Sequence, residues 1–261
     1  MVPKFPDLLL GLGKEDRVHI WHATLKPGVS IADLRRVLSR DEILRAEGYR
    51  FERDRIQFTF GRAVARIILA RYLSADPATI HISYGRHGKP ELRDKSAAGT
   101  PLFFNISRKR DHIVVAVARN RSVGVDIEYI DDQVSVSAIA NTYFQLEESA
   151  YLQKLPTAER LREFYRIWTR KEAILKALGT GLEYPLDSFS ALQDTVVMEA
   201  TWRIVNFETA PGYIGAVAIN DDPPTVDFYC ADPLVTEFQT SQIPVGVLDR
   251  CVTPEHRQTY T

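Results

Sequence analysis

Apolar residues in the first part of the chain follow strand and helix spacing in turn. Residues 18–23 alternate as a strand does, and a short helical stretch follows at 30–38. Ser39 and Glu42 then stand three apart, the pattern of a capping box that opens a helix. Apolar side chains recur at helical spacing over about 53–73. Extended segments are predicted at 80–92, where a turn interrupts them, and at 103–107, 113–118 and 123–128.

The second part of the chain repeats this order of helices followed by strands. A helix is predicted near 137–155, and a long one opens at Thr157 and ends at Gly179, a natural C-terminal cap. Strand-like runs follow at 189–191, 201–207, 213–219 and 226–229. Hairpins and segregated helices favour an α+β fold of helices packed on antiparallel sheets. We therefore expect an N-terminal half at 1–119, a C-terminal half at 120–230 and a tail without clear period at 231–261.

Composition places the protein among ordinary globular chains. Its 261 residues are 45% hydrophobic and 26% charged, which argues against disordered, collagen-like and coiled-coil proteins. The formal net charge of -1 provides no overall field for nucleic acid or an anionic membrane, so neither is expected as a partner. The apolar run 8–12 does not resemble a secretion signal, and two distant cysteines suit a reducing compartment. We expect a cytoplasmic protein.

Two carboxylates interrupt the apolar pattern of the strand at 123–128. Side chains of a strand point alternately to opposite faces, so Asp126 and Glu128 share the face of Gly124. Their Cα atoms are expected about 6.5 to 7 Å apart, close enough for both to bind one hard cation. An acidic strand facing solvent is the alternative from this strand alone.

A third carboxylate, Glu172, falls within the apolar stripe of the long helix at 157–178. Burying a carboxylate there is costly unless it is paired or bound to a cation, and Lys176 follows one helical turn later. A simple pair between Glu172 and Lys176 along the helix is the alternative. Three carboxylates and a lysine favour a magnesium and phosphate site over a zinc site, because Mg²⁺ selects oxygen ligands.

Other common site patterns are missing from the sequence. The six histidines show no metal-ligand spacing, and there is neither a phosphate-binding P-loop nor a G-x-S-x-G motif. Arginines are dense over residues 45–71 and recur at Arg108 and Arg110 beside Lys109. These basic residues are either a solvated face or a rim for a phosphate or an acidic partner.

Two stretches of sequence carry a resemblance to a known family. They are Gly-Val-Asp-Ile-Glu at 124–128 and Trp-Thr-Arg-Lys-Glu-Ala-Ile-Leu-Lys-Ala-Leu-Gly-Thr-Gly-Leu at 168–182. Supporting matches in the same order lie at 88–90, 104–107, 144–148 and 185–189. On these residues the chain resembles the larger, Sfp-like 4′-phosphopantetheinyl transferases, from about residue 38 to residue 189.

The resemblance implies a fold of two pseudo-symmetric halves, with coenzyme A and Mg²⁺ bound at their junction. Family members transfer phosphopantetheine from coenzyme A to a serine of an acyl or peptidyl carrier protein and release adenosine 3′,5′-bisphosphate. By resemblance, Asp126, Glu128 and Glu172 bind Mg²⁺ and Lys176 contacts the pyrophosphate. Negative charge that builds on phosphate oxygens during transfer explains these residue types. Glu148 aligns with the carboxylate proposed to accept the serine proton, with Glu147 one register away.

The resemblance also assigns contacts with coenzyme A to the N-terminal half. Gly88, Lys89 and Pro90 are implied along the adenosine portion, and Ser107 is implied to bind phosphate. Arg108 replaces the histidine that usually follows this serine, and an arginine can still bind phosphate through two hydrogen bonds. Gln57 lies about where some members bind the 3′-phosphate with an arginine, and Arg62 or Arg55 is the substitute.

Two other functions are kept open at this point. Arg108 motivates a non-catalytic module that binds coenzyme A or a carrier protein. A magnesium-dependent phosphodiesterase, in which water replaces the serine, is the second. The two-half type implies a monomer and broad tolerance of carrier proteins, by resemblance only.

Overall fold

A computed structural model of the protein describes residues 17–93, 101–221 and 224–240. The first of its two four-stranded sheets has the order β10-β1-β5-β4. Its strands are β1 (Arg17–Thr24), β4 (Leu102–Lys109), β5 (His112–Arg119) and β10 (Thr225–Cys230). β1 pairs antiparallel with β5 and parallel with β10, whereas β4 pairs antiparallel with β5 and forms the free edge of this sheet.

The second sheet is antiparallel throughout and has the order β6-β9-β8-β7. Its strands are β6 (Val123–Tyr129), β7 (Thr195–Val197), β8 (Thr201–Phe207) and β9 (Tyr213–Asn220). A separate hairpin joins β2 (Ile82–Tyr84) and β3 (Pro90–Leu92). Two edge strands, β4 and β6, therefore lie where the sheets meet.

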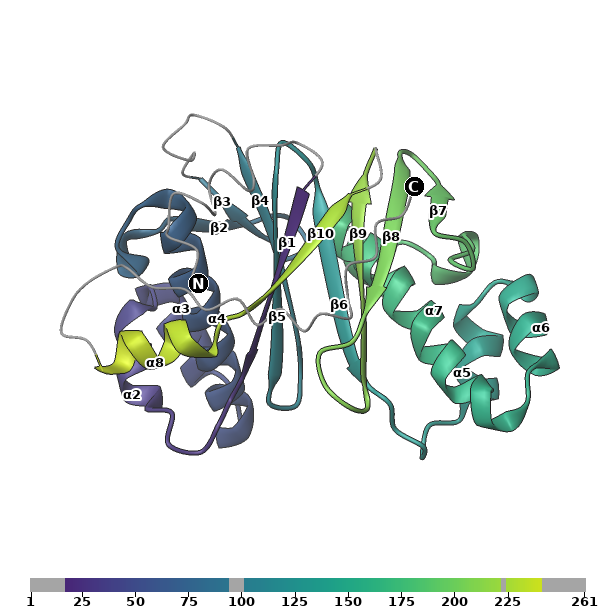
Figure 1. The fold of residues 1–261 in the computed structure, drawn as a ribbon, viewed down its shortest axis with the longest axis horizontal. Helices are drawn as coiled ribbons and strands as arrows, with labels where there is room; N and C mark the ends of the chain where they lie inside the picture. Colours follow the sequence, from purple (N-terminus) through teal and green to yellow (C-terminus); the bar gives the residue numbers. More distant parts are fainter. Residues whose placement is uncertain (1–16, 94–100, 222–223, 241–261) are drawn as a thin grey trace.

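Helices cover the outer face of each sheet, so that the two sheets lie between two helical layers (Figure 1). The first helical layer contains α2 (Ile31–Leu34), the 3-10 turn Arg35–Val37, α3 (Arg40–Glu47), α4 (Glu52–Leu73), the 3-10 turn Pro77–Thr79 and α8 (Asp232–Thr240). The second contains α5 (Val136–Tyr143), α6 (Leu146–Lys154), α7 (Thr157–Leu178) and the 3-10 turns Gly181–Glu183 and Leu186–Ser188.

The apolar core follows these layers. One cluster packs the inner faces of the two sheets against each other and includes Val18, Val114 and Val125. Another packs α4 on the outer face of the first sheet, and α7 is packed on the second sheet in the same way. The α+β class and the two-half arrangement predicted from the sequence are therefore confirmed. No helix among the described residues is both long and apolar enough to cross a membrane.

Three predictions about the second half and one about the tail need correction. Residues 137–155 are two helices, because the chain is extended at Phe144 and Gln145. Residues 189–191 are not a strand, and β7 lies a few residues later. β10, assigned to the half at 120–230, joins the sheet of the first half. The predicted tail begins with α8, whose Leu234 and Val235 are buried in the core around α4.

Candidate active site

Side chains of β4 join the two sheets at their facing edges. Asn105 and Ser107 stand two residues apart on β4 and point to the same side. Asn105 Oδ1 accepts a hydrogen bond from the backbone N–H of Val125 (3.0 Å), and Ser107 Oγ accepts one from that of Ile127 (3.3 Å). The Asn-x-Ser motif thus satisfies backbone donors at the edge of β6 and holds β6 in register with β4.

Gly124 lets α7 approach β6 closely. A Cβ atom at this position would lie 2.0 Å from the carbonyl oxygen of Ala173 and 2.3 Å from the amide nitrogen of Ala177, so only glycine fits. Val125 and Ile127 are buried between the sheets, as the alternation predicted. Gly124 faces α7 instead, and Asp126 and Glu128 share its face of the strand, where they meet Glu172 and Lys176.

Asp126, Ser107 and Lys176 form a connected polar group at this junction. The Ser107 hydroxyl donates to Asp126 Oδ1 (2.8 Å), and Lys176 Nζ donates to Asp126 Oδ1 (2.6 Å) and to Ser107 Oγ (3.0 Å). Asp126 is 3% exposed, and its other oxygen, Oδ2, is buried and has no hydrogen-bond partner among the described residues. The arrangement therefore leaves one acceptor oxygen of a buried carboxylate unused.

Glu128 and Glu172 complete the acidic side of a cleft of ≈ 360 Å³, which is also lined by Ile106, Ser107, Arg108, Asp126, Trp168 and Lys176. Burial raises the pKa of Glu172, and the charge of Asp126 raises it further. The pKa of Glu128 is raised by burial and by Asp126, although Lys109 forms an ion pair with this carboxylate. The three carboxylates thus repel one another across the cleft.

These carboxylates do not form a finished metal centre. Within the described ranges, no three His, Cys, Asp or Glu side chains are grouped closely enough to hold a metal ion. Lys176 and Lys109 occupy positions beside Asp126 and Glu128 that a cation would otherwise take. The donor set nevertheless consists of carboxylate oxygens, the ligands that Mg²⁺ prefers.

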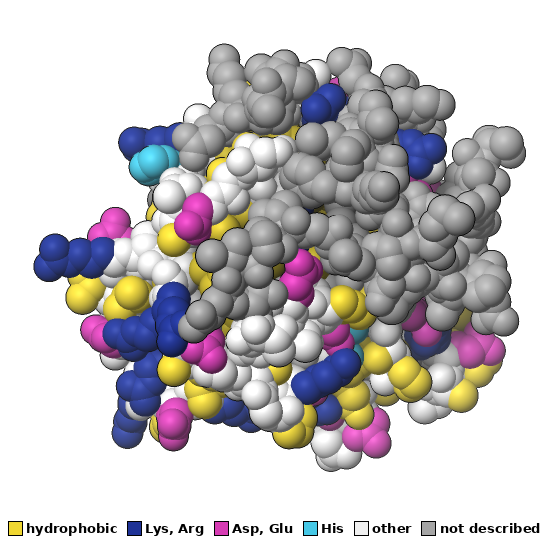
Figure 2. Space-filling view, turned by 60° about the vertical axis from the view of Figure 1, so that its left-hand side comes forward, with side chains coloured by type: hydrophobic (Ala, Val, Ile, Leu, Met, Phe, Trp, Pro, Cys, Tyr) yellow, Lys and Arg dark blue, Asp and Glu magenta, His cyan; other side chains and the backbone are white. Residues whose placement is uncertain are grey.

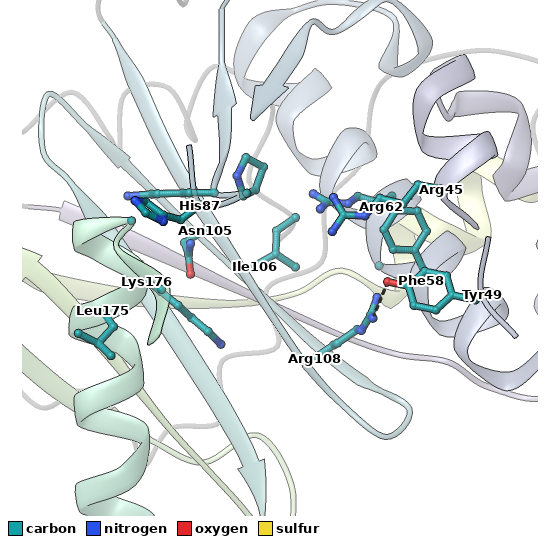
Figure 3. A pocket seen from close by; sticks show the side chains of 16 residues that line it. Arg45, Tyr49, Phe58, Arg62, His87, Asn105, Ile106, Arg108, Leu175 and Lys176 are labelled. Atoms are coloured by element: carbon teal, nitrogen blue, oxygen red, sulfur yellow. Dashed lines mark hydrogen bonds between the residues drawn. The ribbon is translucent and has the colours of Figure 1, made fainter. Parts of the chain in front are cut away.

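Three arginines line a second cleft of ≈ 290 Å³ that continues from the first (Figure 3). Arg45, Arg62 and Arg108 lie 5.4 to 5.8 Å from the ring centre of Phe58, and Arg108 also donates to the hydroxyl of Tyr49 (3.5 Å). Burial, together with the like charges of Arg45 and Arg108, lowers the pKa of Arg62. In the part of the chain that the structure describes, none of the three has a carboxylate partner, so an anion is favoured here.

The two clefts share Ile106, Arg108 and Lys176, so the arginines and the carboxylates line one continuous surface. Figure 3 shows the arginines with Tyr49 and Phe58 at one end of the arginine-lined cleft and Lys176 at the other. Gln57 and Arg55, two positions considered for the 3′-phosphate, are not part of its lining, whereas Arg62 is. On the face shown in Figure 2, several Lys and Arg side chains lie along the left-hand edge, with Asp and Glu side chains among them.

The turn before β3 lines the same cleft through Gly88, Lys89 and Pro90. Gly88 has φ 81°, a backbone conformation that favours glycine. Lys89 Nζ donates to the carbonyl oxygen of Ala177 (2.6 Å) near the C-terminal end of α7, and burial lowers the pKa of Lys89. Lys89 therefore links the β2–β3 hairpin to α7, and its ammonium group already donates a hydrogen bond there.

Ser107 and Glu148 differ most from their predicted surroundings. By resemblance Ser107 is expected to bind phosphate, but in the structure its hydroxyl group donates to Asp126. Glu148 is fully buried and is not part of either cleft. Its Oε1 accepts from the backbone of Ala191 (2.7 Å), and its Oε2 is 2.8 Å from Lys171 Nζ. A carboxylate enclosed in this way is not accessible to a serine of another protein, whereas Glu147 is exposed.

Sequence reasoning did not single out Arg45, Tyr49, Phe58 and Asn105 as site residues. In the sequence, Arg45 is only one member of a dense basic run. Their common location arises because α3, α4 and β4 converge at one end of the cleft. The recurrence of aromatic residues beside the arginines was the available signal.

Comparison with known proteins gives a consistent result. A model of the 4′-phosphopantetheinyl transferase superfamily matches residues 122–210, and one for the N-terminal part of 4′-phosphopantetheinyl transferases matches residues 21–120. The chain is 33% identical over 222 residues to 4′-phosphopantetheinyl transferase HetI of Nostoc sp., covering 85% of this chain and 89% of that protein. It is 40% identical over 114 residues to 4′-phosphopantetheinyl transferase AcpT of Salmonella typhi, covering 44% of this chain and 56% of AcpT.

Proposed function

The chain belongs to the 4′-phosphopantetheinyl transferase family, and we propose that it transfers the phosphopantetheine group of coenzyme A to a serine of an acyl or peptidyl carrier protein. The serine oxygen forms a bond to the phosphorus that bears the pantetheine arm, the bond from this phosphorus to the bridging oxygen breaks, and the serine proton is released. The products are the modified carrier protein and adenosine 3′,5′-bisphosphate.

One observation carries this proposal: the arginine cleft and the carboxylate group are continuous through Arg108 and Lys176. A donor with phosphates at both ends of its nucleotide part fits such a surface. Arg45, Arg62 and Arg108 would bind phosphate at one end, since planar guanidinium groups match phosphate oxygens. Lys176 would contact the pyrophosphate at the other end, and Gly88 and Pro90 would border the adenosine between them.

The acidic side of the cleft fits a bound Mg²⁺. Within the described ranges Asp126 Oδ2 is a buried acceptor without a partner, and burial together with the charge of Asp126 raises the pKa of Glu128 and Glu172. A divalent cation among these three oxygen donors would relieve that repulsion. Asp126, Glu128 and Glu172 would hold the ion, and its charge would stabilise negative charge on the phosphate oxygens.

The protein's own groups orient the reactants around this centre. Ser107 holds Asp126 through a hydrogen bond and thereby fixes the carboxylate relative to Lys176. The Lys176 ammonium would stabilise the departing bisphosphate, because a cation placed at the leaving oxygen offsets the charge that develops there. A group facing the cleft must take the serine proton, which excludes the enclosed Glu148.

The reaction needs two partners, coenzyme A and a carrier protein, and we propose that it takes place in the cytoplasm with a monomeric enzyme. Both halves of the site come from one chain: β4 and α4 from the first half, β6 and α7 from the second. No second copy is therefore required to complete the cleft.

The test is the intact mass of an apo carrier protein after incubation with enzyme, coenzyme A and Mg²⁺, with and without a chelator. We expect a gain of one phosphopantetheine that the chelator prevents. Asp126→Asn should lower kcat by at least about 100-fold, whereas Asp132→Asn, at an exposed carboxylate outside both clefts, should not. Absence of transfer to both fatty-acid and peptide-synthetase carriers would refute the proposed reaction.

The KM for coenzyme A in arginine variants tests whether the arginine-lined cleft binds this donor. Arg62→Met should raise the KM for coenzyme A about 10-fold, because a charge-assisted hydrogen bond to phosphate is lost. Arg53→Met is the matched control, since Arg53 is exposed on the same helix and does not line the cleft. Equal KM values for the two variants would contradict the assignment of phosphate to these arginines.

A further inference from the structure

Glu148 has a close structural counterpart in the other half of the protein. Glu42 is the third residue of α3, and Glu148 is the third residue of α6. In each, Oε2 accepts a hydrogen bond from the backbone N–H of the residue that precedes the helix, Ser39 (3.0 Å) or Gln145 (2.9 Å). Both carboxylates therefore cap the helix to which they belong.

The same oxygen of each carboxylate pairs with a buried cation on the following long helix. Glu42 Oε2 lies 2.6 Å from Arg66 Nε in α4, and Glu148 Oε2 lies 2.8 Å from Lys171 Nζ in α7. Both helices have 22 residues, and Arg66 and Lys171 are each the fifteenth residue of their helix. All four side chains are at most 1% exposed.

Each cation also binds the loop that follows its helix. Arg66 donates to the carbonyl oxygens of Pro77 (2.9 Å) and Ile80 (3.0 Å). Lys171 donates to the carbonyl oxygens of Leu186 (2.8 Å) and Phe189. A capping glutamate, a cation at one helix position and two loop carbonyls thus recur in both halves.

The first half has this arrangement but no acidic residue that corresponds to Glu172. The residue after Arg66 is Ile67, which is buried in the core, whereas the residue after Lys171 is Glu172. Glu42, like Glu148, is not part of either cleft. The shared geometry accordingly identifies a structural device that exists apart from the chemistry.

In the second half this device sets the rotation of α7. Successive residues of a helix are about 100° apart, so Glu172 and Lys176 lie about 40° apart on one face, and Lys171 lies about 100° around the helix from Glu172. Lys171 is fixed on its own side by Glu148, the two carbonyls and the ring of Phe189, 4.4 Å from Nζ. Rotation of α7 that moved Glu172 out of the cleft would break these contacts.

We propose that Glu148 is a positioning residue that acts through Lys171 to hold Glu172 and Lys176 in the cleft, and that it does not accept the serine proton. This inference rests on the site proposed above for phosphopantetheine transfer. It predicts that Glu148 and Lys171 act as one unit. A base, in contrast, would be needed independently of Lys171.

The test compares Glu148→Gln, Lys171→Met and the double variant, with Arg66→Met as the matched control in the other half. For folded protein below its melting temperature, both single variants should lower kcat by about 10- to 100-fold, as expected for a displaced site. The KM for coenzyme A should stay within about 2-fold, and the double variant should be no worse than the poorer single one. The midpoints of the pH profile of kcat/KM should match those of the wild type. Arg66→Met should lower the melting temperature and keep kcat.

Two results would overturn the inference. Loss of a limb of the pH profile in Glu148→Gln but not in Lys171→Met would identify Glu148 as the base. A lower melting temperature with unchanged kcat in both variants would show that Glu148 and Lys171 stabilise the fold but do not position the site. Wild-type enzyme and Asp126→Asn are assayed alongside: an inactive wild type or an active Asp126→Asn would refute the proposed site itself, separately from Glu148.

Discussion

Acidification should destabilise the fold through a pair of histidines on neighbouring strands of the first sheet. His22 on β1 and His112 on β5 lie diagonally across two paired strands, since His22 pairs with Val114 and His112 pairs with Thr24. Their rings are stacked at 4.9 Å, and His22 Nε2 lies 2.7 Å from His112 Nδ1. One nitrogen must donate and the other accept in this hydrogen bond. Protonation of the acceptor would place two donors against each other.

The surroundings of the pair set the direction of its titration. The pKa of His22 is lowered from 6.5 to about 4, chiefly by burial and in addition by the neighbouring His112. Asp232 and Asp111 oppose the change and Lys26 adds to it, while the Tyr213 ring of β9 packs 3.9 Å from that of His112. The pKa of His112 is lowered as well, chiefly by burial.

The sign and size of the effect follow from linkage. Above pH 6.5 both folded and unfolded states hold His22 neutral, so the pKa shift has no effect on stability there. As the pH falls below 6.5, the unfolded state binds the proton first, and stability is lost until the folded state also binds it near pH 4. Between pH 8 and pH 5 the free energy of unfolding should fall by about 2 kcal/mol from His22 alone.

Urea unfolding followed by tryptophan fluorescence at pH 8, 6.5 and 5 measures this loss. His22→Phe keeps an aromatic ring against His112 and removes the titrating group of residue 22. The difference in unfolding free energy between pH 8 and pH 5 should be smaller in this variant by about 2 kcal/mol, with an unchanged dependence on urea concentration. The same pH dependence in wild type and His22→Phe would refute the assignment to this pair.

Two further outcomes are expected. Gly124→Ala should yield little folded protein, because its Cβ would meet the backbone of α7 at 2.0 Å. Gly48→Ala is the control, and it should express and melt like the wild type because its nearest contact is at 3.4 Å. Equal thermal stability of the two variants would contradict the close approach of α7 to Gly124. Tyr143→Ser should raise the KM for the carrier protein about 10-fold and leave the KM for coenzyme A unchanged, because the Tyr143 ring is 47% exposed beside Trp168 at the acidic cleft. The rate of holo-carrier formation at varied carrier concentration measures this KM. An unchanged carrier KM in the variant would contradict a role of Tyr143 in carrier binding.

Local pattern was sufficient for the parts of the site that lie on single elements. Alternation in β6 determines that Asp126 and Glu128 share a face, and helical spacing in α7 determines that Glu172 and Lys176 do. The capping box at Ser39 and Glu42 was likewise readable, since both partners are three residues apart. Each of these predictions depends on the geometry of one strand or one helix.

What the sequence does not reveal depends on partners far apart in the chain. Alternation in β10 is the same whether it joins the second sheet or β1, and only tertiary packing selects β1. Glu148 looks like an exposed acidic residue of a first helical turn. Its enclosure requires Lys171 and Ala191, 23 and 43 residues later. Arg62 of α4 becomes recognisable as a site residue only when it is seen beside Arg108 of β4.

The two halves share one structural frame but carry different surfaces. In each half a 22-residue helix covers a sheet and is tied to a capping glutamate through its fifteenth residue. Beyond this frame the halves diverge: arginines line the cleft beside α4, and carboxylates line it beside α7. Because Asn105 and Ser107 bond β4 directly to the edge of β6, the two surfaces are held side by side. The donor that we propose would therefore meet the arginines and the carboxylates where these two edge strands lie together.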